Sequence, residues 1–158
     1  FPNFSIAQNM AISRSLEDGG YKGAMGLFHE VDEQRTAENQ RELLALKCHS
    51  VNQNITELSG GNQQKVLISK WLCCCPEVII FDEPTRGIDV GAKAEIYKVM
   101  RQLADDGKVI LMVSSELPEI ITVCDRIAVF CEGRLTQILT NRDDMSEEEI
   151  MAWALPQE

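Results

Sequence analysis

A run of four apolar residues that ends in two acids constrains the fold more than any other stretch of the chain. Val78 to Phe81 are all β-branched or aromatic, and Asp82 and Glu83 follow directly. Such a run is typical of a strand buried in a parallel sheet. Ligands of open α/β sheets bind at the carboxyl ends of the strands, so the run predicts a site at the two acids. A strand that merely ends in a polar loop is the alternative.

Strands and helices alternate in the second half of the chain. Apolar runs predict further strands at residues 109–113, 127–131 and 135–139, the last two joined by a Glu-Gly turn. Apolar spacing predicts helices at residues 90–103, at 116–123 with a break near Pro118, and after Ser146, which is expected to cap the last helix. This order predicts an α/β fold with a mainly parallel sheet.

The first third of the chain has mostly helical signals. Ser5 is a candidate cap for a short first helix, a glycine-rich loop is expected at residues 18–26, and a second helix at residues 32–47. A third helix follows Gly60 and Gly61 and is expected to end at Pro76. We therefore predict a helical subdomain over residues 1–75 and a strand-rich part over residues 76–158.

Composition narrows the classes of protein. The chain has 158 residues and a net charge of −10, which argues against a nucleic-acid partner because such proteins need a basic face. No apolar run approaches the ~20 residues of a membrane span, and the start resembles no signal peptide. The lack of an initial Met predicts a piece of a longer chain. The cysteines form no C-x-x-C pair and are expected to be core residues of a reducing compartment: Cys48, Cys73, Cys74, Cys75, Cys124 and Cys131.

The segment LSGGNQQK at residues 58–65 is the second candidate site. Its glycines free the backbone and a helix with apolar periodicity follows at once. The first N–H groups of a helix are unpaired and lie at the positive end of its dipole, which suits a phosphate. An ordinary Ser-Gly-Gly helix entry explains Ser59, Gly60 and Gly61 equally well when they are considered alone.

Three motifs together resemble an ABC transporter ATPase. LSGGNQQK at 58–65 is similar to its signature motif, FDEPT at 81–85 to its Walker B motif, and GID at 87–89 to its D-loop, in the right order and spacing. The longer run DEPTRGIDVGAK at 82–93 resembles the ATPase subunit of bacterial monosaccharide importers, in particular its second ATPase domain. The resemblance covers nearly the whole chain and implies a partial P-loop NTPase core with a helical subdomain.

The resemblance implies a role for each site residue, with ATP and Mg²⁺ as cofactors. Ser59, Gly60 and Gly61 would bind the γ-phosphate of an ATP held by another ATPase domain, and Asn62 and Gln63 belong to the same nucleotide-binding motif. Asp82 would act on Mg²⁺, Glu83 would polarise the attacking water, and Asp89 would couple two ATP sites at a dimer interface.

The implied partners are a second ATPase domain, membrane-spanning permease subunits that contact the helical first third, and, indirectly, a periplasmic sugar-binding receptor. The implied location is the cytoplasmic face of the bacterial inner membrane. No nucleic-acid partner is expected.

Two departures from the family pattern limit what the chain can do alone. No G-x-x-x-x-G-K-[ST] sequence is present, since Val109 follows the one Gly-Lys pair at 107–108. The P-loop strand is therefore expected to be missing, and the isolated chain is expected to lack ATP turnover and to dimerise, swap or rearrange. Ser115 also occupies the position of the family's switch histidine, which predicts a weak site beside Glu83.

Two other classes of function stay open. One is a non-catalytic interaction module that supplies only the signature motif to a partner ATPase domain. The other is a DNA-repair or chromosome ATPase of the same superfamily, which the acidic composition and the residues 86–93 disfavour.

Overall fold

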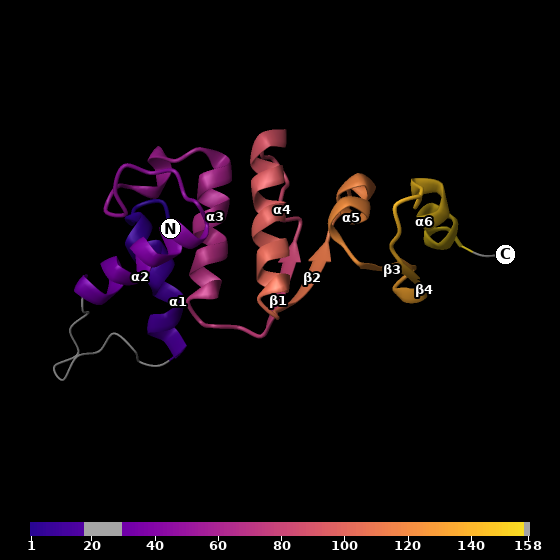
Figure 1. Cartoon of the computed structure of the whole chain (residues 1–158), viewed down its shortest axis with the longest axis horizontal. Coiled ribbons are helices and arrows are strands. Elements are labelled where there is room, and N and C mark those ends of the chain that lie inside the picture. Colours follow the sequence, from indigo (N-terminus) through magenta and orange to yellow (C-terminus); the bar gives the residue numbers. More distant parts are fainter. Residues whose placement is uncertain (18–29, 157–158) are drawn as a thin grey trace. The chain divides into compact units, whose positions relative to one another are not determined.

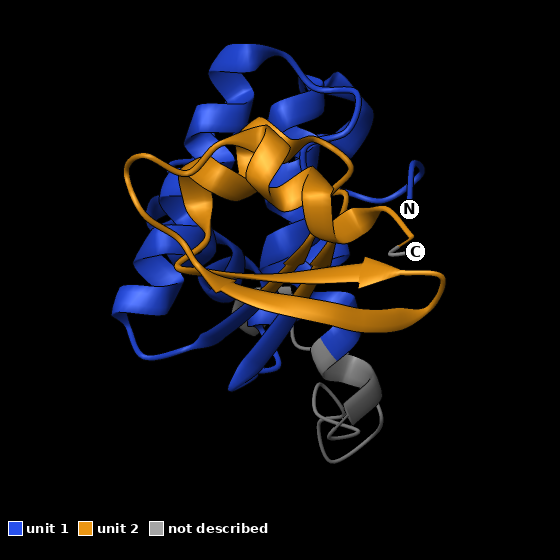
Figure 2. Cartoon of the chain, turned by 90° about the vertical axis from the view of Figure 1, so that its right-hand side faces the viewer, with its two compact units in different colours: residues 1–79, 85–110 blue, residues 80–84, 111–158 orange. Residues whose placement is uncertain are grey.

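The computed structural model describes residues 1–17 and 30–156 of the chain (Figure 1). These residues form two compact units, coloured separately in Figure 2. Unit 1 comprises residues 1–79 and 85–110, and unit 2 comprises residues 80–84 and 111–158. The glycine-rich loop expected at residues 18–26 lies outside the described residues. The division at residue 75 stays a prediction.

Unit 1 is mainly helical, and α1 (Ile6–Glu17) packs against both α2 (Glu30–Leu43) and α3 (Gly60–Leu72). The short 3-10 helix η1 (Ile55–Glu57) precedes α3, and α4 (Val90–Asp105) packs beside it. The cap expected for α1 is confirmed, because the Gln8 N–H donates to Ser5 Oγ over 3.2 Å. The buried core of these helices includes Ile6, Met10, Ala37, Val51 and Val66.

The second helix ends earlier than its sequence pattern predicts. α2 ends at Leu43, four residues before the expected end, and it begins two residues before the expected start. Ala45 adopts a left-handed conformation with φ of 46°, which the α-helix does not accommodate. Leu44 and Leu46 on either side of it are buried. The apolar side chains that suggested a longer helix thus fill the core from a turn. The third helix likewise stops at Leu72, before the expected Pro76.

The apolar run that ends in two acids forms strand β1 (Val78–Asp82), as predicted. Strand β1 pairs with β2 (Val109–Val113). The Val109 N–H donates to the Glu77 carbonyl over 2.9 Å, and the Glu83 N–H donates to the Val113 carbonyl over 2.9 Å. The starts of the two strands are therefore adjacent, and so are their ends, which makes the pair parallel.

The prediction that these strands are fully buried is wrong for the described residues. In β1, Ile79 and Phe81 are buried, but Val78 and Ile80 are 52% and 69% exposed. In β2, the side chains of Val109 and Leu111 are also about half exposed. A continuous apolar run is fully buried only when both faces of its sheet are covered. The described residues bury only alternate side chains of β1.

Unit 2 contains the hairpin of β3 (Arg126–Cys131) and β4 (Arg134–Thr140), with α6 (Glu147–Ala154) packed on it. Figure 2 shows the two long strands of this unit with its helices beside them. The turn residues Glu132 and Gly133 both have positive φ, as a two-residue hairpin turn requires. The expected cap of α6 is confirmed, because the Glu149 N–H donates to Ser146 Oγ over 3.2 Å.

One detail of unit 2 differs from its prediction. α5 (Leu117–Val123) is continuous, whereas a break was expected near Pro118. The proline lies in the first turn of the helix, where its missing N–H removes no helical hydrogen bond. The α/β class is confirmed; one strand pair is parallel and the other antiparallel. Among the described residues, no helix is both long and apolar enough to cross a membrane.

The cysteines are free thiols, but the prediction that all six are core residues is wrong. Only Cys73 is buried, and Cys75 is exposed with a left-handed φ of 50°. The other four are partly buried. The chain leaves α3 through Cys73–Cys75, and three consecutive residues of such a turn cannot all point into the same core.

Candidate functional site

The first candidate site lies at the start of α3 in unit 1. Ser59 is the N-cap residue with φ of −62° and ψ of 157°, and it is exposed together with Gly60. The first helical bond runs from the Gln63 N–H to the Ser59 carbonyl over 2.9 Å. The N–H groups before it lie at the positive end of the helix dipole, and the Ser59 hydroxyl makes no cap bond to the backbone. This end can donate hydrogen bonds to an anion.

Two amide side chains hold this helix start. Asn62 Nδ2 donates to Ser59 Oγ over 2.9 Å, and Asn62 Oδ1 accepts from the Lys47 N–H over 3.0 Å. Gln63 Nε2 donates to the Leu58 carbonyl over 2.9 Å. The predicted site residues 59–63 therefore form one connected group.

The two glycines of this site have different surroundings. A Cβ on Gly61 would lie 2.5 Å from the Cβ of Ala92 in α4, which is shorter than any stable contact. A Cβ on Gly60 would meet Ile88 Cγ2 at an ordinary 3.7 Å. Gly61 is also buried, so its lack of a side chain lets α3 approach α4 closely.

The start of α4 holds a further predicted residue and an ion-pair group. Asp89 is the exposed N-cap of α4, and its Oδ1 accepts from the Ala92 N–H over 2.9 Å. Glu95 on the same helix pairs with Lys65 Nζ over 2.9 Å and with Lys47 Nζ over 3.0 Å. The hydrogen bond from Lys65 is the main cause that lowers the pKa of Glu95 to about 2.

Lys65 is the residue of this group that sequence reasoning missed. It is only 3% exposed, and its Nζ also donates to the Ala45 carbonyl over 3.1 Å. Its position in the helix could have predicted its burial, because Lys65 lies on the same face of α3 as Gly61 and Leu72, which are also buried. For Lys47 and Glu95 the sequence contains no comparable signal.

The second candidate site lies in unit 2, where β1 ends. Asp82 is exposed and Glu83 is partly buried. Glu83 has a left-handed φ of 47°, and its Oε1 accepts from the Ser115 N–H over 2.9 Å. The structure thus brings Glu83 and Ser115 together, as the predicted roles require, but through the main chain of Ser115 rather than its exposed side chain.

The predicted residues divide between the units. Residues 59–63 and Asp89 belong to unit 1, whereas Asp82, Glu83 and Ser115 belong to unit 2. Carboxylate oxygens are the ligands that Mg²⁺ prefers, so the exposed Asp82 fits a magnesium ion that takes its remaining ligands from water and phosphate. In the part of the chain that the structure describes, no three side chains cluster as a complete metal site.

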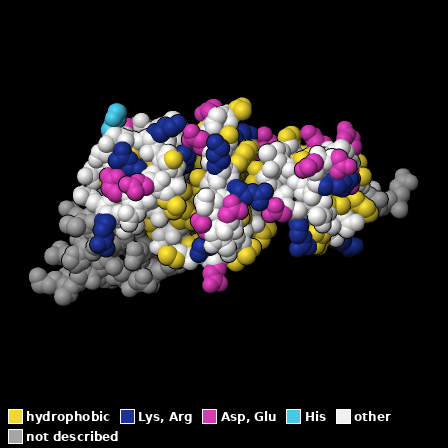
Figure 3. Space-filling model, in the orientation of Figure 1, with side chains coloured by type: hydrophobic (Ala, Val, Ile, Leu, Met, Phe, Trp, Pro, Cys, Tyr) yellow, Lys and Arg dark blue, Asp and Glu magenta, His cyan; other side chains and the backbone are white. Residues whose placement is uncertain are grey.

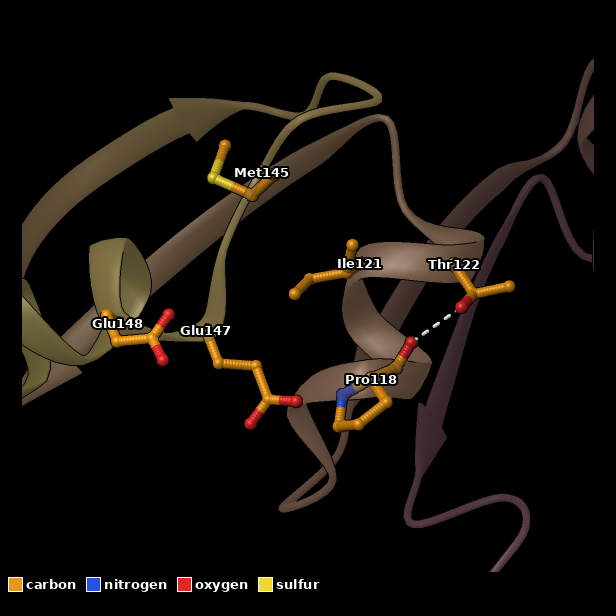
Figure 4. Close-up of a pocket in the computed structure, with 6 residues that line it drawn as sticks. All are labelled: Pro118, Ile121, Thr122, Met145, Glu147 and Glu148. Carbon is orange, nitrogen blue, oxygen red and sulfur yellow. Dashed lines mark hydrogen bonds between the residues drawn. The ribbon is translucent and has the colours of Figure 1, made fainter.

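A cavity of about 530 Å³ in unit 2 contains none of the predicted residues. Figure 4 shows the six lining residues, with the Glu147 carboxylate beside Pro118. Thr122 Oγ1 donates to the Pro118 carbonyl over 2.6 Å. On the face shown in Figure 3, basic and acidic side chains are interspersed rather than gathered by sign. Neither the cavity nor this distribution of charge indicates a further binding or catalytic site.

Comparisons with known proteins agree with the motifs. The profile of the ABC transporter family matches residues 1–86. The D-allose import ATP-binding protein of Escherichia coli (strain K12) is 99% identical over 158 residues, which are 100% of this chain and 31% of that protein. The ribose import ATP-binding protein of Bacillus cereus (strain ZK / E33L) is 48% identical over 152 residues, which are 96% of this chain and 30% of that protein.

Solved structures agree on the fold. A dimeric ATP-binding cassette in a post-hydrolysis state with ADP and Pi has a TM-score of 0.71 and 23% identity, over 90% of this chain and 59% of that one. The chain thus spans less than a third of the length of the curated relatives above and more than half of a solved cassette.

Proposed function

This chain belongs to the ABC transporter family, and from that premise we propose that it forms part of the ATP-hydrolysing subunit of a bacterial sugar importer. The observation that carries the proposal is the 99% identity, over all 158 residues, to a D-allose import protein. The substrate class is a monosaccharide, and D-allose is the first sugar to test.

The start of α3 is proposed to bind the γ-phosphate of an ATP held by a second ATPase domain. Ser59 is exposed and its hydroxyl is not used as a backbone cap, so it can donate to a phosphate oxygen. The N–H groups of Gly60 and Gly61 add donors at the positive end of the helix. Asp89, exposed at the start of the neighbouring α4, is proposed to contact the second domain.

The end of β1 is proposed to serve a different ATP site. Asp82 would hold Mg²⁺, which would neutralise charge on the phosphate oxygens. Glu83 would accept a hydrogen bond from the attacking water and so orient it. Its carboxylate is held by the Ser115 N–H, and a serine side chain there supplies no imidazole. We therefore expect the site beside Glu83 to be the weaker of the two.

The proposed partners follow from the same membership. They are a second ATPase domain and membrane-spanning permease subunits at the cytoplasmic face of the inner membrane, with a periplasmic sugar receptor acting indirectly. A nucleic-acid partner is disfavoured by the net charge of −10.

A second candidate function is supply of the signature motif in trans without catalysis. One observation favours it: the 158 residues contain no P-loop sequence to bind the β- and γ-phosphates. ATP turnover by the isolated chain separates the two descriptions, and we expect none above background.

The proposal is tested by ATP turnover of a subunit of the relatives' full length that contains these 158 residues, assembled with its permease. Ser59→Ala removes a hydrogen bond to a charged group and is expected to lower kcat/KM by about 10-fold or more. Glu83→Gln is expected to have a smaller effect, because its site is the weaker one.

Ser146→Ala is the matched control, since it removes the same hydroxyl from the cap of a helix that holds none of the predicted site residues. If neither Ser59→Ala nor Glu83→Gln changes turnover or sugar uptake, the assignment of both sites is wrong.

A further inference from the structure

A short chain of hydrogen bonds leads from the loop after α2 to the Ser59 hydroxyl. The Lys47 N–H donates to Asn62 Oδ1 over 3.0 Å, and Asn62 Nδ2 donates to Ser59 Oγ over 2.9 Å. All three residues belong to unit 1. Both polar atoms of the Asn62 side chain are thereby engaged within the protein.

The direction of each bond follows from the chemistry of the groups. A main-chain N–H can only donate, so the amide atom that faces Lys47 must be the oxygen. The NH₂ group of Asn62 therefore faces Ser59, and because NH₂ can only donate, Ser59 Oγ must accept there. A hydroxyl has one proton and two acceptor sites, so the Ser59 proton is left for another acceptor.

The loop that sets this direction is itself held in place. Lys47 Nζ pairs with Glu95 Oε1 over 3.0 Å, and Glu95 Oε2 pairs with the buried Lys65 of α3 over 2.9 Å. The Ala45 carbonyl accepts from the same Lys65 over 3.1 Å. The main chain at Lys47 is thus tied to α3 and α4, so the Asn62 amide cannot rotate without losing the bond from the Lys47 N–H.

We propose that Asn62 is a positioning residue, which acts on the nucleotide through Ser59 by keeping the serine proton pointed away from the protein and available to a phosphate oxygen. This inference rests on the proposed function and refines it. Asn62 was expected among the nucleotide-binding residues, and the structure assigns it an indirect part in that binding.

A double-mutant cycle tests the proposal in a subunit of the relatives' full length, assembled with its permease. The variants are Asn62→Ala, Ser59→Ala and the double variant, and the measurement is kcat/KM for ATP. We expect Asn62→Ala to lower kcat/KM by about 2- to 10-fold. We expect no further loss when it is added to Ser59→Ala, because the group through which it acts is then absent.

Asn62→Asp keeps the size of the side chain and the acceptor for the Lys47 N–H, so it tests orientation without loss of that bond. Its carboxylate cannot donate to Ser59 and instead accepts the serine proton. The loss in kcat/KM is therefore expected to equal or exceed that of Asn62→Ala. Asn52→Ala, which removes an exposed amide side chain from the same unit, is the matched control and should leave kcat/KM unchanged.

The outcomes separate the two proposals. If Asn62→Ala lowers kcat/KM equally with and without Ser59, Asn62 acts independently of the serine and the positioning role is wrong. The role is also wrong if Ser59→Ala lowers kcat/KM while Asn62→Ala and Asn62→Asp do not. If Ser59→Ala has no effect, the phosphate site itself is wrong. Hydrogen exchange at the start of α3 distinguishes these results from unfolding, and Asn62→Asp decides the question if Asn62→Ala unfolds.

Discussion

The start of α3 in unit 1 and the end of β1 in unit 2 are both predicted nucleotide sites, but they are held by different means. The first is supported by a buried glycine against Ala92, a hydrogen-bond chain through Asn62 and an ion-pair group around Glu95. The second is held at Glu83 by two bonds to main-chain groups: the Glu83 N–H donates to the Val113 carbonyl, and the Glu83 carboxylate accepts from the Ser115 N–H.

The difference shows which contacts fix the position of each site. In unit 1, packing and polar contacts of several residues fix the helix start, so a change far from Ser59 can still disturb it. In unit 2, the position depends mainly on Glu83, whose left-handed conformation costs a non-glycine residue on the order of 1 kcal/mol. Variants of the supporting residues should therefore affect the two sites unequally.

The largest expected effect is that of Gly61→Ala. Its Cβ would overlap with Ala92, and overpacking of this kind costs about 1–3 kcal/mol in the free energy of unfolding. Hydrogen exchange measured by mass spectrometry should increase in α3 and α4, while unit 2 is unchanged. Gly60→Ala is the matched control, since its Cβ has ordinary space.

A second substitution, Ala92→Gly, removes the overlapping methyl group. Combined with Gly61→Ala, it should restore the protection of α3 and α4 from hydrogen exchange. If hydrogen exchange in α3 is as slow in Gly61→Ala as in the wild type, close packing against Ala92 is not the reason for a glycine at position 61.

The pH dependence of unit 1 is the next largest effect. The folded-state pKa of Glu95 is lowered to about 2, so its contribution to stability is complete above its ordinary pKa near 4.5 and is lost as the pH falls from there towards 2. Because the carboxylate is 38% exposed, we expect a screened contribution of only about 1 kcal/mol.

Glu95→Gln should reduce stability at pH 7 by about that amount and flatten the acid limb of the stability curve between pH 4.5 and 2, measured by denaturant unfolding. Lys65→Met supplies the partner control, because it removes the buried cation that is the main cause of the lowered pKa of Glu95 and leaves the pair with Lys47. An unchanged acid limb in Glu95→Gln would show that the ion pairs do not stabilise the unit.

The smallest effects come from two helix caps, one in each unit. Asp89→Ala and Ser146→Ala each remove a side-chain acceptor from an N-cap, and each is expected to cost about 1 kcal/mol or less in the free energy of unfolding. Only Asp89→Ala should also lower ATP turnover, because Asp89 is the proposed contact with a second domain. Equal loss of turnover in both variants would mean that Asp89 acts as a cap alone.

Local patterns predicted most elements of the fold. Strands β1 and β2, a helix at the Ser-Gly-Gly entry and the Ser146 cap were all expected, because backbone preference and side-chain periodicity decide them within a few residues. The glycines were expected before that helix, but α3 already begins at Gly60. Errors occurred where distant contacts compete with the local pattern. Leu44 and Leu46 suggested a helix, but they are buried from a turn around the left-handed Ala45.

By itself, the sequence determined the family, the class of fold and the two places at which phosphate and carboxylate chemistry are proposed, because those depend on residue types at short, fixed spacings. Only the tertiary structure revealed what supports them: that Gly61 lets α3 approach α4 closely, that Lys65 is a buried cation, and that the Asn62 side chain joins Ser59 to the main chain of Lys47. The physical reason is that these contacts join residues up to 31 positions apart, for example Gly61 and Ala92, and no local pattern contains them.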